Sequence, residues 1–451
     1  MIKIKNYIMY KSSKAAHALN IILLSSFVAF SCMPEERNPI QVEEAVKSAI
    51  FESMQEWYFW NNELPASINV SNFSSNQALL DALTFKPLDR WSYLTTREAF
   101  NQAFTGQNSG HGFGWGFDEQ ERLFLTFVFD EAPAGIDGWQ RGWQVLEIND
   151  QPITSYRTPN GYNFQLGPNE TGISNKFKFL LPDGSETTRV NAKATYQSNS
   201  VLFKDTYEMT GKKVGYWVYQ SFKATAGLTP TRSQEVEESF TFFQQNGIDE
   251  LIIDLRYNGG GSVAVTEQIL NYLIPASHNN KVMYTNKYNS DKSNFNTNVN
   301  FSKKGSLNLS RIVLITSRGS ASASELLINS LTPYMDLFLI GDNTYGKPVG
   351  SFPLSRYHKT LEENNVELVP ITFATANADG RAEFFDGFPA NALVSDDPAK
   401  NWGDISERRL KAALEYIETG SVNSRMRQEF YRPRWELIDA FSGLQKEFPA
   451  F

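Results

Sequence analysis

The pattern of hydrophobic and polar positions divides the chain into three parts. Residues 42–104 place apolar side chains at helical spacing, most clearly in VEEAVKSAIFESMQEWYFW, and predict a small helical N-terminal domain. Residues 105–196 change to short apolar runs between glycine turns, which predicts a β domain. Its segment FKFLLPDGSETTRV is typical of a hairpin with Asp183 and Gly184 at the tip. The helical part contains no catalytic cluster, so we expect it to serve packing.

Residues 197–420 alternate apolar strands with helices. The predicted strands include KVGYWVYQSF, DELIIDL, RIVLITS and DLFLIGD, and the predicted helices include TRSQEVEESFTFFQQNGI, SVAVTEQILNYLI and SASELLINSLTP. This alternation predicts a mainly parallel sheet with helices packed on it, and the whole chain is therefore a multidomain α+β protein. An amphipathic helix in DISERRLKAALEYIET closes this part, and residues 421–451 form a tail without an assigned role.

The N-terminus carries lysines, then an apolar run over residues 21–30, then Cys32. The run is too short for a membrane-spanning helix. The segment resembles a bacterial lipoprotein signal over residues 1–31, which implies lipidation of Cys32 and a tether over residues 32–41. Ala29 and Phe30 depart from the usual pattern, a start at Met9 would give a more usual length, and a plain secretory signal is the alternative. We expect a lipid anchor in a bacterial cell envelope, on the periplasmic face or the cell surface.

Charge and cysteine content narrow the possible partners. The net charge is −8, and the four lysines of the first 31 residues leave −12 on the rest. An acidic chain without a basic block argues against nucleic acid as a partner. A single cysteine excludes an internal disulfide and a cysteine-based metal cluster. The serine–lysine chemistry expected below needs no metal and no cofactor.

Three loops that follow predicted parallel strands carry the candidate chemistry, because open α/β sheets place their sites there. They are RYNGGG after LIIDL, RGSASASE after IVLITS, and DNTYGKPVG after LFLIG. A serine at such a turn lies at a helix N-terminus, which favours developing negative charge. Ser322 and Glu325 also fit a capping box, which explains the same residues without catalysis.

A serine nucleophile needs a base. The four histidines lie in the signal or in turn-like and polar stretches; they are His17, His111, His278 and His358. A lysine can act instead if burial keeps it neutral, and Lys347 follows an apolar strand. An N–H group of the triple glycine can form half of an oxyanion hole.

The segments DLRYNGGG, GSASASE and TYGKPVG together resemble the three core motifs of the C-terminal processing peptidases, the S41 family of Ser/Lys proteases. The resemblance implies an α/β core of the crotonase or ClpP type. It implies Ser322 as nucleophile and Lys347 as general base, 25 positions apart as in the family. It also implies an oxyanion hole formed by the N–H groups of Ala323 and Gly260.

Neighbouring polar residues are assigned other roles. Ser320 and Ser324 are the alternative nucleophiles. Glu325 is interpreted as a helix cap, and Asp254 and Arg256 as residues that hold the loop.

The β part resembles a PDZ domain in HGFGWGF and in EAPAGIDGWQRGWQVLEIND, although Trp143 and Asp150 depart from its pattern. Gly112, Phe113 and Gly114 occupy the place of the PDZ carboxylate-binding loop. Successive N–H groups there can bind an anion, and a peptide can add to the adjacent strand. The alternative is a glycine-rich turn without a ligand.

Several positions depart from the protease pattern. Many members carry an orienting glutamine four residues after the lysine, where this chain has Ser351, and Pro348 replaces a glycine. NADGRAEFFDGFPAN resembles a later family segment except at Phe388 and Asn391. We expect an envelope-anchored serine endopeptidase that cleaves unfolded or C-terminal protein segments. One alternative is a decayed, peptide-binding scaffold or adaptor. Another is acyl chemistry on a thioester, which leaves the serine–lysine pair unexplained.

Overall fold

The computed structural model describes residues 38–159, 161–209, 211–226, 231–423, 425, 430 and 431. The expected signal, Cys32, most of the tether and most of the tail lie outside the described residues. The chain divides into the units Met1–Val42 and Glu43–Phe451, and the second contains all the sheets. None of the helices in the described ranges has the length and apolarity that a membrane span requires.

The N-terminal region is helical, as predicted. Its helix α1 begins at Pro39, three residues before the expected start of the domain. Ser75 and Thr96 cap the next two helices, because their side chains accept the N–H groups of Ala78 and Ala99. The three helices are α1 (Pro39–Trp57), α2 (Asn76–Leu83) and α3 (Arg97–Phe104).

The helical region shares its core with a later part of the chain. Strand β1 (Tyr93–Thr95) pairs antiparallel with β20 (Glu367–Val369), and the Phe59 N–H donates to the Ile371 carbonyl. Ile50 and Leu80 lie in the same buried cluster as Leu361. The region therefore packs against residues 349–374 and has no separate core.

The β region contains one antiparallel sheet in the order β10-β9-β5-β4-β3. The predicted hairpin is confirmed, since β9 and β10 pair from Leu180↔Glu186 onward. Strand β3 lies at the edge and pairs only with β4 among the described residues. The PDZ assignment stays a prediction. The elements are β3 (Phe113–Phe117), β4 (Leu123–Val128), α4 (Pro133–Ile136), β5 (Gln144–Ile148), β9 (Ser174–Leu180) and β10 (Glu186–Ala192).

Short ladders complete this region. Strand β2 pairs with β11, so the two ends of the region lie side by side. The short strands are β2 (Gln107–Gly110), β6 (Gln151–Pro152), β7 (Arg157–Thr158), β8 (Gly161–Tyr162) and β11 (Ala194–Gln197).

The predicted, mainly parallel sheet is confirmed, with the order β12-β13-β14-β17-β18-β22. All neighbours from β13 to β22 are parallel, and only the edge strand β12 is antiparallel. The strands are β12 (Val201–Met209), β13 (Lys212–Tyr219), β14 (Glu250–Asp254), β17 (Arg311–Thr316), β18 (Asp336–Gly341) and β22 (Ala392–Leu393).

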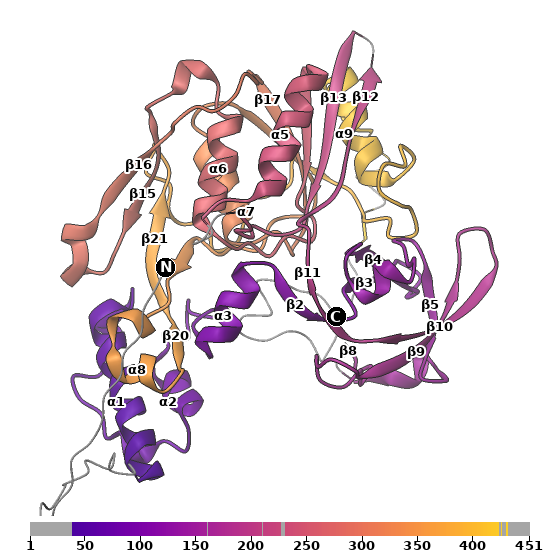
Figure 1. The fold of residues 1–451 in the computed structure, drawn as a ribbon. Coiled ribbons are helices and arrows are strands. Elements are labelled where there is room, and N and C mark those ends of the chain that lie inside the picture. Colours follow the sequence, from indigo (N-terminus) through magenta and orange to yellow (C-terminus); the bar gives the residue numbers. More distant parts are fainter. Residues whose placement is uncertain are drawn as a thin grey trace, which may run out of the picture. The chain divides into compact units, whose positions relative to one another are not determined.

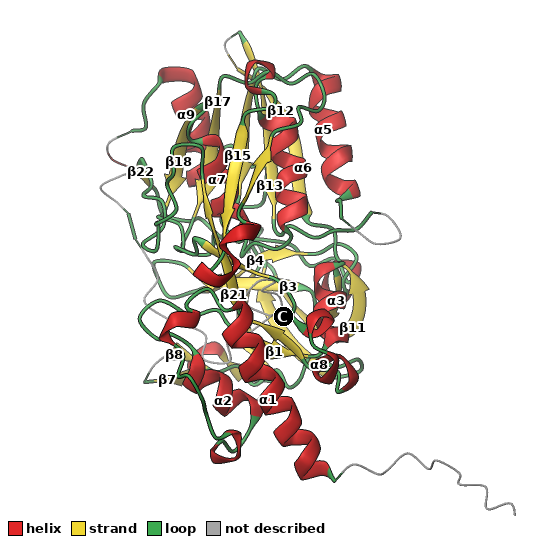
Figure 2. Ribbon diagram, turned by 90° about the vertical axis from the view of Figure 1, so that its left-hand side faces the viewer, coloured by secondary structure: helices red, strands yellow, loops and turns green. Residues whose placement is uncertain are grey.

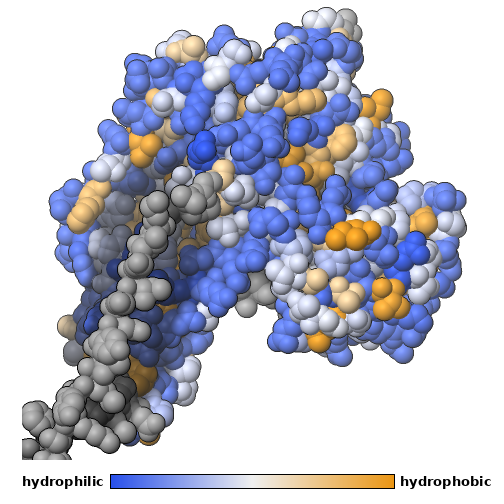
Figure 3. Space-filling model, viewed as in Figure 1, coloured by the Kyte–Doolittle hydropathy of each residue, from blue (hydrophilic) through white to orange (hydrophobic). Residues whose placement is uncertain are grey.

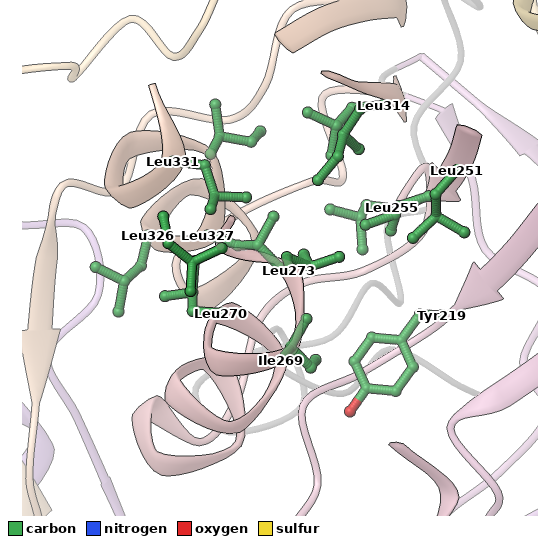
Figure 4. Close-up of a cluster of buried hydrophobic side chains, with 14 of the residues drawn as sticks. Tyr219, Leu251, Leu255, Ile269, Leu270, Leu273, Leu314, Leu326, Leu327 and Leu331 are labelled. Carbon is green, nitrogen blue, oxygen red and sulfur yellow. The ribbon is translucent and has the colours of Figure 1, made fainter. Parts of the chain in front are cut away.

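Both faces of this sheet are buried, which explains the continuous apolar runs. In β14, Leu251 and Ile253 belong to the cluster under α5, α6 and α7, whereas Ile252 belongs to the cluster under α9. Figures 1 and 2 show α5 and α6 on one side of the strands and α9 on the other. Figure 4 shows the leucines of α6 and α7 facing strand residues such as Leu314. The helices are α5 (Gln234–Asn246), α6 (Val263–Leu273), α7 (Ala323–Leu331) and α9 (Arg408–Thr419).

A second, antiparallel sheet has the order β16-β15-β21-β19. Its strand β19 begins two residues after Lys347, so this sheet supports the loop that carries the lysine. The elements are β15 (Val282–Lys287), β16 (Thr297–Asn300), β19 (Val349–Ser351), α8 (Lys359–Glu363) and β21 (Ile371–Ala376).

The surface shows no large apolar area on the face in Figure 3, where small hydrophobic groups are scattered among hydrophilic ones. Among the described residues, the large hydrophobic side chains that are exposed come from separate parts of the chain. They are Ile40, Ile136, Val190, Phe295, Tyr357, Leu393 and Ile405. Single exposed hydrophobic residues are normal for a globular protein.

Lys223 is a buried lysine between the β region and the core. Its Nζ donates to Ser198 Oγ at 2.6 Å and lies 5.2 Å from the centre of the Phe129 ring. Burial lowers the pKa of Lys223 to about 7, and the charge of Glu235 acts in the opposite direction. The neighbouring Phe222 pairs with Gly261, so Lys223 lies next to the glycine loop.

Replacing Lys223 with Met is expected to change how stability depends on pH. Between pH 7 and 10 the unfolded chain binds a proton on this lysine that the folded chain lacks, so wild-type stability rises with pH. The variant lacks this rise. The difference in free energy of unfolding between wild type and variant should therefore change by on the order of 3 kcal/mol between pH 7 and pH 10. Urea unfolding at several pH values measures it.

Lys204→Met is the control, because Lys204 also lies over an aromatic ring, that of Phe242, but is half-buried. A Lys223→Met protein with the same pH slope as the wild type would contradict the prediction.

Candidate active site

The structure brings the three predicted loops together at the C-terminal edge of the parallel strands. The Ala321 N–H donates to the Asn258 carbonyl at 3.1 Å, which joins the serine turn to the glycine loop. The Tyr345 N–H donates to the Ser320 carbonyl at 2.9 Å, which joins the lysine loop to the serine turn. Backbone hydrogen bonds therefore hold all three loops in one group.

Ser320 and Ser324 serve to connect these loops. Both are fully buried. Ser320 Oγ donates to the Leu255 carbonyl at 2.7 Å, and Ser324 Oγ donates to the Asn258 carbonyl at 3.0 Å. Ser322 is half-buried and is the one of the three that solvent reaches. The geometry thus favours Ser322 over both alternative nucleophiles.

Ser322 lies in a strained turn directly before α7. Its φ is 53° and its ψ is −110°, whereas a capping residue normally has extended backbone. A positive φ is uncommon outside glycine and costs about 1–3 kcal/mol, so the surrounding contacts must stabilise it. The turn places the serine at the N-terminus of the helix, where partial positive charge favours an anion.

Gly260 lies directly against this serine. Its φ is +117°, and a Cβ atom at this position would lie 2.8 Å from Ser322 Cβ and 3.2 Å from the Ala323 nitrogen. Only glycine fits there. The Gly260 N–H donates to Asn258 Oδ1 at 3.0 Å, while the Ala323 N–H has no acceptor among the described residues. Of the two expected oxyanion donors, the Ala323 group is thus the one that points to no protein acceptor.

Lys347, on the third loop, lies beside the serine turn. It is 8% exposed. Its backbone N–H donates to Glu325 Oε2 at 2.8 Å, and the Ser322 N–H donates to the same oxygen at 3.1 Å. The two backbone nitrogens are therefore less than about 6 Å apart, which brings the expected nucleophile and base onto adjacent segments.

Glu325 has a larger part in this site than its interpretation as a cap suggested. Its carboxylate is fully buried. Its other oxygen accepts the Gly346 N–H at 2.7 Å and Thr344 Oγ1 at 2.6 Å. Burial raises the pKa of Glu325, although its hydrogen bonds act in the opposite direction. The only sequence signal was the spacing of Glu325 from Ser322, which predicts one of these four bonds.

Ser351 stands where the family pattern has a glutamine. It lies on β19 and is paired with Ile371. In the described ranges its hydroxyl makes no hydrogen bond. Position 351 therefore supplies no orienting amide.

The expected carboxylate-binding loop packs inward. Phe113 is fully buried, and Cβ atoms at Gly112 and Gly114 would lie 1.9 Å from Ala132 Cβ and 2.2 Å from the Phe127 ring. The side-chain positions of this loop are therefore filled by the protein itself. A ligand here would meet the backbone along the outer edge of β3.

Metal-binding clusters of histidine, cysteine, aspartate or glutamate are absent from the part of the chain that the structure describes.

Two family models match the chain. Residues 213–361 match Peptidase family S41, and residues 45–93 match the Peptidase S41 N-terminal domain. Among curated relatives, carboxy-terminal processing protease CtpB of Bacillus subtilis is 21% identical over 252 residues, which is 56% of this chain and 49% of that protein. A carboxyl-terminal-processing protease of Synechocystis is 26% identical over 247 residues, which is 54% of each. The chain spans about half the length of these relatives.

A solved structure gives the same fold. A protein of Bacteroides fragilis assigned to the S41 proteases superposes with a TM-score of 0.65 at 22% identity, over 82% of this chain and 96% of that one. The three loops of the expected motifs lie within or beside the matched range and meet at one edge of its sheet. The chain therefore contains a peptidase S41 domain over residues 213–361 and an S41 N-terminal domain over residues 45–93.

Proposed function

We propose that this protein is a serine endopeptidase in which Ser322 is the nucleophile and Lys347 the general base. One observation carries the proposal: both residues donate their backbone N–H to the same oxygen of Glu325, beside a glycine that leaves room for no side chain. The names of the curated relatives, which are carboxyl-terminal processing proteases, agree with this reaction.

The proposed reaction is an acyl transfer. The Lys347 amine takes the proton from Ser322 Oγ as the oxygen attacks the carbonyl carbon of a peptide bond. The Ala323 N–H and the N-terminus of α7 stabilise the negative oxygen that forms, whereas the Gly260 N–H is bonded to Asn258 Oδ1 and Gly260 contributes the space beside the serine. The lysine then gives its proton to the leaving amine, and water releases the acyl group from the serine by the same route.

We further propose that the substrate is an extended, unfolded or C-terminal polypeptide segment captured by the β region. Strand β3 supports this, because it ends its sheet and its outer edge has no strand partner among the described residues. Such an edge can bind a peptide through backbone hydrogen bonds. The lipid anchor on Cys32 and a location in the cell envelope are part of the same proposal and rest on the N-terminal sequence.

Cleavage of casein should require both members of the dyad. We expect Ser322→Ala and Lys347→Ala to lower the rate by about 1,000-fold or more, because each removes a group that takes part in bond making. The unfolding midpoint should change little for Ser322→Ala, since Ser322 is only half-buried. Gel-based cleavage assays and urea unfolding measure the two effects.

Matched controls come from residues outside the site. Ser330 lies on the same helix, and its buried hydroxyl has no hydrogen-bond partner among the described residues. Lys303 Nζ donates to two backbone carbonyls, those of Tyr272 and Leu307. Ser330→Ala and Lys303→Met should cleave casein at the wild-type rate. Full cleavage by Ser322→Ala would contradict the proposal, and peptide binding without any cleavage by the wild type would favour a scaffold instead.

Gly260→Ala should abolish cleavage as well. The new methyl group would lie 2.8 Å from Ser322 Cβ and must displace the serine or the loop. The matched control is Gly184→Ala, because Gly184 also has a positive φ but has open space around it. Both changes strain the backbone, but only the Gly260→Ala methyl group would press on the serine. At equal concentrations of folded protein, only Gly260→Ala should therefore lower the cleavage rate. Equal rates for the two variants would mean that Gly260 does not shape the site.

A further inference from the structure

Glu325 is a buried carboxylate whose hydrogen bonds go mainly outside its own helix. A capping glutamate at this position normally bonds the backbone N–H that starts its helix. Glu325 makes that bond to Ser322, but its other three donors lie 19 to 22 residues further along the chain. The carboxylate therefore links two segments, one with the serine and one with the lysine.

Each oxygen of the Glu325 carboxylate accepts two hydrogen bonds. Oε2 accepts the N–H groups of Ser322 and Lys347, and Oε1 accepts the N–H of Gly346 and the hydroxyl of Thr344. Thr344 Oγ1 accepts the Phe388 N–H at 2.6 Å, so its own proton is available for Glu325. Four donors around one carboxylate fit its ionised form, which only accepts hydrogen bonds.

Two contacts join the lysine loop to the serine turn. One is the backbone hydrogen bond from the Tyr345 N–H to the Ser320 carbonyl, and the other is the Glu325 carboxylate. In the described residues, Glu325 is the side chain that bonds the backbone of both Ser322 and Lys347.

We propose that Glu325 is a positioning residue that sets the separation of Ser322 and Lys347. The proposal rests on the proposed dyad. Glu325 does not touch the substrate in this scheme. It acts through the backbone of the two residues, and a displacement of about 1 Å at such a site can cost a factor of about 100 in rate.

Glu325→Gln tests this directly, because glutamine keeps the shape but places an NH₂ group against N–H donors on one side. The readout is the second-order rate of covalent reaction of Ser322 with a fluorophosphonate probe, measured per folded molecule well below the unfolding temperature. We expect a fall of about 100-fold. In casein cleavage the fall should lie in kcat and leave KM unchanged, because the substrate is not contacted.

The matched control is Glu367→Gln. Glu367 is also a buried carboxylate, and it accepts the N–H and the Oγ of Ser355 at 2.8 Å and 2.6 Å. It lies on β20, away from the three loops. This variant should lose comparable stability and react with the probe at the wild-type rate.

A double substitution separates positioning of the lysine from general support of the serine. Once Lys347 is alanine, there is no base left to position. Glu325→Gln in the Lys347→Ala background should therefore lower the probe rate no further. If Glu325→Gln does not fold, Thr344→Val tests the proposal instead. This change removes one hydrogen-bond donor to Glu325 Oε1 and should slow the probe reaction about 10-fold.

The outcomes are distinct. The proposal is wrong if Glu325→Gln reacts as fast as Glu367→Gln, if Thr344→Val reacts as fast as wild type, or if Glu325→Gln is equally harmful with and without Lys347. A wild type that does not react with the probe, or a Lys347→Ala variant that reacts as fast as wild type, would overturn the dyad and with it this proposal.

Discussion

The hydrogen bonds of Asn258 are the constraint on which the site depends. Its carbonyl accepts the Ala321 N–H and the Ser324 hydroxyl, one on each side of Ser322. Its side chain donates to the Tyr219 carbonyl and accepts the Gly260 N–H. Because Asn258 is fully buried, an unmade bond would leave a polar group without water, at a cost of about 1–3 kcal/mol. These hydrogen bonds therefore fix the glycine loop relative to the serine turn.

The parallel sheet supplies the frame for this contact. Its strands are apolar on both faces and pack between two helix layers. Because the strands are parallel, the loops that follow their C-terminal ends lie at one edge of the sheet. A buried ion cluster holds the end of β14, where Arg256 contacts Asp254, Asp396 and Glu407 at 2.7 to 2.8 Å. Loss of one partner of such a cluster is strongly destabilising, typically by about 3–5 kcal/mol. This rigidity allows Ser322 to keep its unfavourable φ.

Much of this fold followed from local sequence pattern. The hairpin at Asp183 and Gly184 is set by residues within one turn, and the structure has it. Gly247 after α5 has a φ of 61°, the left-handed conformation that ends a helix. The three loops were found because strand ends in a parallel sheet meet at one edge. The features that the sequence did not predict depend on distant contacts: the positive φ of Ser322, the bonds of Glu325 to residues 344–347, and the core that the N-terminal helices share with residues 349–374.

Peptide mapping after reaction with a fluorophosphonate probe tests the central claim most directly. The protein from residue 33 onward is treated with the probe, digested, and sequenced by tandem mass spectrometry. The account predicts one adduct, on Ser322, and none on Ser320 or Ser324, whose hydroxyls are fully buried and bonded to backbone carbonyls. An adduct on a different residue, or casein cleavage that continues while Ser322 stays unmodified, would contradict the account.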